Sequence, residues 1–138
     1  MVNVLIYIES RFPADRVKIR EFVEQYLHKK LSGTIEVGVS IVGDRKMKLL
    51  NKTYRDIDDT TDVLSFPIDD PGASTRRDIA VGFSPEKSSQ DKILRLGDVV
   101  VSYPEAVREA TEIHSMVDKQ VEFLIAHGLD HLMGIHHE

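Results

Sequence analysis

VDKQVEFLIAHGLDHLMGIHHE, residues 117–138, is the stretch around which the rest of the chain is predicted to be built. Its apolar residues recur at helical spacing and form one stripe, made up of Val117, Val121, Leu124, Ile125, Gly128 and Leu132. Phe123 and Ala126 are apolar as well, so we expect a central helix that is mostly buried. Gly128 costs about 1 kcal/mol of helix propensity relative to alanine, which indicates a close approach to a neighbouring element.

Four of the six histidines lie in the last twelve residues of the chain. His127 and His131 are four residues apart, so they would project from one side of the helix. Gly134 tolerates a positive φ, and a turn there could bring His137 towards the same point. Three converging imidazoles make a divalent-metal site, with zinc as the expected occupant. The fourth position is left to water, which is typical of a catalytic rather than a structural zinc.

Simpler interpretations of these histidines exist. A pair at this spacing is often only the polar edge of a helix, and a terminal His-His could be the remainder of a purification tag. A tag, however, is normally a longer run without matching histidines upstream. The full spacing H-x3-H-x5-H, with glycine three residues after the second histidine, is harder to obtain by chance and favours the metal site.

The same spacing occurs in the metzincin proteases, H-E-x-x-H-x-x-G-x-x-H, with one difference. Gly128 stands where the proteases have their glutamate general base. Without that carboxylate, a zinc-bound water has no proton acceptor for peptide hydrolysis. Asp130 is not a ready substitute, because it lies about 100° round the helix from His131. We therefore expect the metal site to serve a different reaction.

Three segments of the sequence carry recognisable motifs. The first is the histidine segment, HGLDHLMGIHH at residues 127–137. The second is NKTYR at residues 51–55 followed by TDVLSFP at residues 61–67, and the third is LGDVVVS at residues 96–102. Together these segments resemble the YbeY family, the bacterial endoribonucleases of ribosomal RNA maturation. They occur in the order of the family, whereas the N-terminal third of the chain matches only in pattern. His136 replaces the usual aspartate, and Thr60 replaces the usual proline.

This resemblance implies a zinc-dependent, single-strand-specific endoribonuclease. Such an enzyme would act in the 3′-end maturation of small-subunit ribosomal RNA and in ribosome quality control. One Zn²⁺ would be held by His127, His131 and His137 together with a water. Arg55 would be the substrate-binding and catalytic residue, because it coincides with the functional arginine of the family. The implied partners are single-stranded RNA and the small ribosomal subunit.

Two other functions remain open from the sequence. The first is a metzincin-like metal hydrolase or protease, which Gly128 disfavours. The second is a non-catalytic, zinc-containing ribosome-assembly factor. The sequence does not choose between a metal that activates water and one that acts as a Lewis acid on the phosphate, and it names no general base.

Composition sets limits on the class of protein. The chain has 138 residues, 41% of them hydrophobic, and a formal net charge of −5. At this length we expect one domain over residues 1–138. The acidic balance means that any RNA contact has to come from a local basic surface. The lack of cysteine excludes disulfides and cysteine-ligated zinc, and no signal peptide or membrane-spanning run is present, so we expect a cytoplasmic protein without membrane contact.

Hydrophobic periodicity predicts the order strand, helix, strand, helix, strand, strand, helix, helix. We expect an α/β (α+β) fold, in which a small mixed sheet is packed by helices and the metal site lies at the C-terminal end of the central helix. Pro13 is predicted to open the first helix, and Ser115 is predicted to cap the last one. A further strand over residues 79–83 is an additional expectation.

The densest basic run of the chain falls on the predicted second helix. It consists of Arg45, Lys46, Lys48, Lys52 and Arg55. The lysines are interpreted as a solvated helix face. The Arg55 guanidinium could hold a phosphate with two hydrogen bonds and stabilise developing charge. Asp62 and Ser65 could face a cleft, but a role in capping the strand end is favoured.

Overall fold

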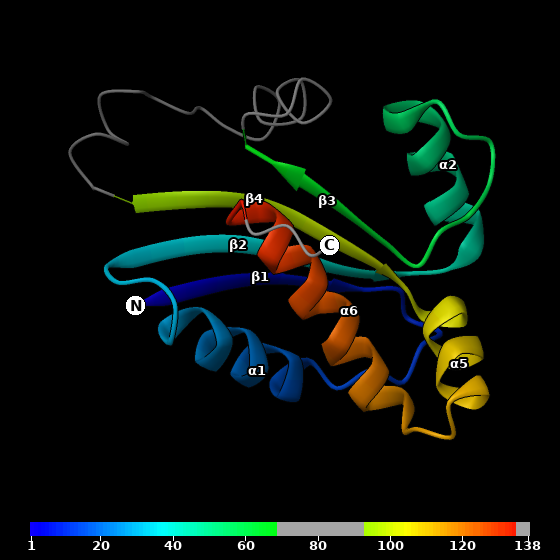
Figure 1. The fold of residues 1–138 in the computed structure, drawn as a ribbon, viewed down its shortest axis with the longest axis horizontal. Coiled ribbons are helices and arrows are strands. Elements are labelled where there is room, and N and C mark those ends of the chain that lie inside the picture. Colours follow the sequence, from blue (N-terminus) through cyan, green and yellow to red (C-terminus); the bar gives the residue numbers. More distant parts are fainter. Residues whose placement is uncertain (69–92, 135–138) are drawn as a thin grey trace.

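The computed structural model describes residues 1–68 and 93–134 of the chain, and its elements follow the predicted order (Figure 1). They are β1 (Val2–Ile8), α1 (Arg16–His28), β2 (Thr34–Val42), α2 (Asp44–Arg55), β3 (Val63–Pro67), β4 (Ile93–Ser102), α5 (Tyr103–Glu112) and α6 (Val117–Leu132). The predicted strand over residues 79–83 and the predicted ligand His137 lie outside the described residues. Within the described part, no helix is long and apolar enough to cross a membrane.

The four strands form one mixed sheet in the order β1-β2-β4-β3. β1, β2 and β4 run parallel, and β3 is antiparallel to β4 at the edge. The mixed α/β fold predicted from the sequence is therefore confirmed. Phe66 lies opposite Asp98, and Pro67 opposite Gly97. The segments TDVLSFP and LGDVVVS, far apart in the chain, are thus neighbouring strands of the sheet.

One face of the sheet carries the main hydrophobic core, which α1 and α6 cover (Figure 1). Its fully buried side chains include Val23, Leu27, Ile35, Val37, Val39, Ile41, Val99, Val101, Leu124, Ile125 and Leu129. α6 crosses β3 and β4 and packs against both strands and against α1. The prediction of a central helix is confirmed, but Phe123 is 63% exposed, so the apolar surface of α6 does not extend all the way round.

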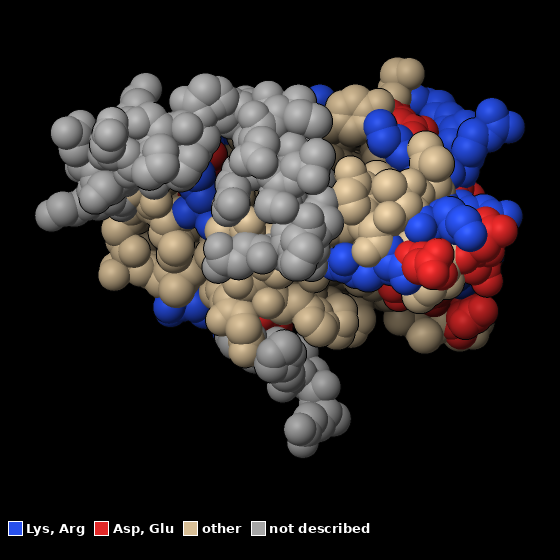
Figure 2. All heavy atoms as spheres, turned by 90° about the horizontal axis from the view of Figure 1, so that it is seen from above, with Lys and Arg blue, Asp and Glu red and all other residues tan. Residues whose placement is uncertain are grey.

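The opposite face of the sheet packs against α2. A second cluster there contains Val42, Met47, Leu64, Phe66 and Val100. Successive side chains of a strand point to opposite faces. Since Leu64 and Phe66 turn towards α2, Val63 and Ser65 of the same strand turn towards α6. Figure 2 views the molecule from the α2 side, with lysine and arginine side chains gathered at the end where α2 lies.

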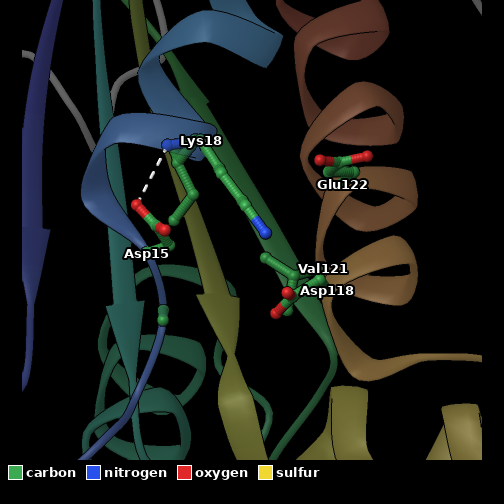
Figure 3. A pocket seen from close by; sticks show the side chains of 7 residues that line it. Asp15, Lys18, Asp118, Val121 and Glu122 are labelled. Carbon is green, nitrogen blue, oxygen red and sulfur yellow. Dashed lines mark hydrogen bonds between the residues drawn. The ribbon is translucent and has the colours of Figure 1, made fainter.

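The starts of two helices differ from the prediction. α1 begins at Arg16, because the Asp15 carboxylate accepts hydrogen bonds from the backbone N–H groups of Val17 and Lys18. Figure 3 shows the bond from Lys18. The predicted opening at Pro13 was wrong by three residues. α6 has Met116 as its N-cap and no side-chain cap. The Ser115 N–H instead donates to the Ala110 carbonyl at 2.9 Å, which ties this residue to the end of α5.

A shallow groove separates the starts of α1 and α6 (Figure 3). It is lined by Ala14, Asp15, Lys18, Ile19, Asp118, Val121 and Glu122. The Lys18 side chain extends from α1 along the groove towards Asp118 on α6. The space inside is about the size of one water molecule, so the groove is a seam between two helices rather than a ligand site.

Candidate functional site

A cleft opens between α6 and β3, with the end of α2 on its rim. It is lined by Arg55, Asp62, Val63, Leu64, Ser65, His127, Gly128 and His131. Its volume is about 340 Å³, within the range of small-molecule sites. The cleft brings together three separate parts of the sequence, namely NKTYR, TDVLSFP and the histidine segment. Two of the three segments that carry the family resemblance therefore meet in the cleft, while LGDVVVS forms the neighbouring strand β4.

His127 and His131 face one another on the last turns of α6. Their Nε2 atoms are 3.2 Å apart, and their ring centroids are 4.7 Å apart with an angle of 70° between the rings. This follows from the spacing of four residues, which places side chains one above the other on a helix. Both rings are half-buried, and the helix behind them is anchored by the buried Leu124 and Leu129.

The separation of these two nitrogens fits ligands of one metal ion. Two nitrogens bound tetrahedrally to zinc at about 2.0–2.1 Å would lie about 3.3–3.4 Å from each other. The observed 3.2 Å is close to this value, and both atoms are Nε2, a nitrogen that commonly ligates metals. The same distance also suits a hydrogen bond in which one ring donates a proton to the other. Two of the three predicted ligands are thus brought together by the fold.

The chain leaves α6 in a left-handed turn, as predicted. Gly134 has φ +80°, and its N–H donates to the His131 carbonyl at 3.1 Å. Residues other than glycine and asparagine rarely adopt this backbone conformation. The position of His137, three residues further on, lies outside the described residues.

At Gly128, α6 packs directly against β4. A Cβ atom at this position would lie 2.6 Å from Cγ1 and 3.0 Å from Cγ2 of Val99. The Val99 side chain is fully buried and has little freedom to move. The close approach predicted from the glycine is confirmed. The position where the metzincin proteases carry glutamate therefore has no room for a side chain here.

Asp130 points away from the cleft, as its angular position on the helix predicts. It is 5% exposed, and its carboxylate accepts a hydrogen bond of 2.7 Å from the Tyr26 hydroxyl on α1. Burial, together with this hydrogen bond to Asp130, raises the pKa of Tyr26 to about 12. The Asp130 carboxylate thus joins α6 to α1 rather than serving the cleft.

Arg55 is held on the cleft wall by contacts on three sides. Its Nη2 donates to the Ser65 carbonyl at 2.8 Å, and its Nη1 donates to the Tyr54 carbonyl at 3.2 Å. The guanidinium carbon lies 5.0 Å from the centroid of the Phe66 ring. α2 ends at this residue because Asp56 adopts a left-handed conformation with φ 59°. The fold therefore fixes the cation beside β3, where it lines the cleft with the histidines.

Asp62 and Ser65 also line the cleft, although a structural role was favoured for them. Asp62 has a structural role as well as a place in the cleft, because its backbone carbonyl accepts a hydrogen bond from the Ser102 N–H at 2.8 Å. Its side chain is hydrogen-bonded to Glu109 on α5, which accepts a further hydrogen bond of 2.8 Å from Gln120. Burial, followed by the contact with Asp62, raises the pKa of Glu109 to about 7.

Glu109 was missed by the sequence analysis. No local motif contains it, and its partners are 47 residues before it and 11 residues after it. A protonated Glu109 can donate a hydrogen bond to the Asp62 carboxylate, which explains how two acidic side chains come to lie in contact. This pair lies at the side of the cleft where α5, α6 and the start of β3 meet.

The fold and the cleft define a class of α/β protein in which a helix with paired histidines packs on a mixed sheet opposite an arginine. The family model described as "Endoribonuclease YbeY" matches residues 7–138. The chain belongs to the YbeY family, and the resemblance noted in the sequence is confirmed.

Individual relatives agree with this assignment. A protein named "Endoribonuclease YbeY" from Moorella thermoacetica is 37% identical over 108 residues, which are 78% of this chain and 64% of that relative. Proteins of the same name from Aquifex aeolicus and Thermoanaerobacter sp. are 36% and 31% identical, each over 99% of this chain and over 78% and 86% of their own lengths. The solution structure of TM1509 from Thermotoga maritima matches this fold with a TM-score of 0.59 at 23% identity, covering 100% of this chain and 75% of the other.

Proposed function

We propose that this protein is a zinc-dependent endoribonuclease that cleaves single-stranded RNA. We further propose that it acts in the 3′-end maturation of small-subunit ribosomal RNA and in ribosome quality control, in association with the small ribosomal subunit. Membership of the YbeY family supports the RNA substrate, since the relatives are named as endoribonucleases.

The observation that carries this proposal is the pair of Nε2 atoms 3.2 Å apart in a cleft that also holds an arginine. His127, His131 and His137 would hold the zinc, with one coordination position left to water. When bound, zinc supplies Lewis acidity and lowers the pKa of that water. The histidines would be neutral while they bind the ion.

The other residues of the cleft bind and orient the substrate. The Arg55 guanidinium contacts the phosphodiester and stabilises its negative charge. Its hydrogen bonds to backbone carbonyls keep it in place, so little conformational entropy is lost when the substrate binds. The Glu109 carboxyl holds a proton against Asp62 and thereby fixes the position of the Asp62 carboxylate in the cleft.

Cleavage of single-stranded RNA by the metal-loaded full chain tests the proposal. We expect a chelator and the His127→Ala substitution each to reduce the cleavage rate by more than about 100-fold, since changes outside the ligand shell alone cost 10–100-fold. His28→Ala, an exposed histidine near the end of α1, is the matched control and should cleave normally. Metal analysis of untagged protein should find one zinc per chain.

Different results would support the other two functions. Chelator-sensitive cleavage of peptides that is lost in His127→Ala would indicate a protease. If chelation melts the protein and neither loaded nor stripped protein cleaves RNA, the zinc is structural and the protein is an assembly factor. Full RNA cleavage by His127→Ala would contradict the proposed metal site.

A further inference from the structure

We propose that one face of α2 carries the RNA strand away from the cleft and delivers it to a second site beside β1. We name this face the α2 track and define it by Arg45, Lys48 and Lys52. The second site is an open hollow lined by Tyr7, Glu9, Ser10, Arg11, Arg45, Lys46 and Leu49. The choice of RNA as the ligand rests on the proposed function.

The spacing of the cations links the hollow to the cleft. Arg45, Lys48, Lys52 and Arg55 are separated by three, four and three residues, so they project from one side of α2. Arg45 lines the hollow and Arg55 lines the cleft. Their separation of ten residues corresponds to about 15 Å of helix, a length over which a single strand presents several phosphates.

Helix stability does not account for the cations at the start of α2. Arg45 and Lys46 lie in the first turn, where the positive end of the helix dipole disfavours positive charge. Asp44, the acidic residue of that turn, is engaged elsewhere: it pairs with Arg108 at 3.0 Å and accepts a hydrogen bond from Ser102 at 3.1 Å. These two cations therefore do not stabilise the helix, and their position suits the binding of an anionic ligand.

The acidic residues nearby leave most of the track charge unbalanced. Lys48 pairs with Asp58 at 3.9 Å, but both side chains are more than half exposed, and such pairs contribute little. Across residues 1–68 and 93–134, neither Arg45 nor Lys52 forms an ion pair with a described residue. The chain carries a net charge of −5, and Figure 2 shows the lysine and arginine side chains at this end of the molecule interspersed with aspartate and glutamate side chains.

The hollow offers a stacking surface for a nucleobase. Tyr7 is 50% exposed and Leu49 is 63% exposed, on neighbouring elements that both line the hollow. The Lys46 ammonium lies 5.3 Å from the centroid of the Tyr7 ring. Aromatic rings flanked by cations bind single-stranded nucleic acid with little dependence on sequence, because every base has a π face.

Binding of a fluorescent polyuridine oligonucleotide, measured by anisotropy at several salt concentrations in the presence of chelator, tests the track. The test variant is Arg45→Gln/Lys48→Gln/Lys52→Gln. We expect its affinity to fall by more than about tenfold and its salt slope to shrink by about 2, since each phosphate contact on a single strand contributes about 0.7. Its melting temperature should change little. Lys48 forms only an exposed pair, and the small loss from removing Lys52 from the last turn is offset by removing Arg45 from the first turn, where it opposes the helix dipole.

The matched control removes the same charge elsewhere. Lys18→Gln/Lys29→Gln/Lys119→Gln changes three exposed lysines on α1, its end and α6. We expect its affinity and salt slope to stay at the wild-type values. Tyr7→Ala should lose about tenfold in affinity, whereas Tyr7→Phe should retain it, because stacking needs the ring and not the hydroxyl.

The outcomes separate this proposal from the proposed nuclease activity. An unchanged affinity and slope in the α2 variant, or an equal loss in the control, would overturn the track. If the wild-type protein binds the oligonucleotide through α2 but cleaves no RNA when loaded with zinc, the track stands and the nuclease proposal fails. If the wild-type protein binds no RNA, the track falls together with the proposed substrate.

Discussion

Gly128 belongs both to the candidate site and to the packing of α6 against the sheet. It lines the cleft together with the two facing histidines, and a Cβ atom at this position would lie 2.6 Å from Cγ1 of Val99 on β4. The contact fixes the height of α6 above the sheet at the level where the His127 and His131 rings emerge. The spacing of four residues aligns the two ring nitrogens with each other, and the contact between Gly128 and Val99 limits how closely α6 lies against β4.

Replacing Gly128 by alanine tests this directly. Alanine would normally gain about 1 kcal/mol in a helix. Here its Cβ would lie 2.6 Å from Val99, so we expect the free energy of unfolding to fall by about 1–3 kcal/mol. Urea denaturation measures the change, and zinc affinity should weaken in parallel as the histidines shift.

The control for this prediction is a double-mutant cycle with Val99→Ala. That substitution removes the two methyl groups that the new Cβ would meet. In its presence, Gly128→Ala should be neutral or stabilising. A destabilisation of the same size in both backgrounds would show that the Val99 contact is not the cause.

The positions of individual site residues could be predicted from the sequence where a short local pattern determines them. The spacing of four predicted that His127 and His131 face each other, and the glycine predicted a close approach. It failed for Glu109, because this side chain reaches Asp62 only through tertiary packing of α5 against the start of β3. The roles of the histidines as ligands and of Arg55 in catalysis remain predictions.

At the scale of the elements, one polar junction joins α5, α6 and the start of β3. Glu109 of α5 is hydrogen-bonded to Asp62 before β3 and to Gln120 of α6. Its pKa rises from the ordinary 4.5 to about 7, chiefly because of burial. The folded protein thus binds this proton more tightly than the unfolded chain. The stabilising contribution is complete below pH 4.5 and is lost as the pH rises through 7.

The Glu109→Gln substitution should remove this pH dependence. Glutamine can still donate to Asp62 and accept from Gln120, but it does not titrate. We expect the variant to match the wild-type protein in stability at pH 5 and to exceed it at pH 8, as measured by urea denaturation. Glu112→Gln, an exposed position on the same helix, should follow the wild-type profile. Parallel pH profiles for wild type and Glu109→Gln would refute the explanation.

The order and type of the elements could be read from hydrophobic periodicity. The alternation of Ile35, Val37, Val39 and Ile41 predicted β2, and all four side chains are buried. The run Val99–Val101 predicted a strand buried on both faces, which β4 confirms. Helix starts were less accurate, since Asp15 took the capping position expected near Pro13. Asp15 decides the start because its carboxylate caps the backbone N–H groups of Val17 and Lys18, which the phenylalanine before Pro13 cannot do.

At the scale of the whole molecule, the elements that form the cleft are held in place by the main hydrophobic core. The main core joins α1, α6 and all four strands, and it includes the side of α6 opposite the histidines. The cleft contributes little apolar burial of its own. The fold is therefore expected to exist before any metal binds.

Removal of the metal should accordingly leave a folded protein. We expect the chelated protein to keep its far-ultraviolet circular dichroism and a cooperative thermal transition. Its melting temperature should fall only by the amount that corresponds to the lost binding free energy, which excess zinc restores. Calorimetry with and without chelator makes the comparison. Non-cooperative melting of the stripped protein would mean that the ion is part of the core.

The contact between Gly128 and Val99 also limits how this lineage can change. A single base change turns some glycine codons into glutamate codons, so the protease motif is genetically close. Every such mutant, however, would have to displace a buried valine before gaining any benefit from the new carboxylate. A glutamate at position 128 would therefore require that Val99 first be replaced by a smaller residue. That replacement alone would leave a less stable protein, because it removes buried methyl groups.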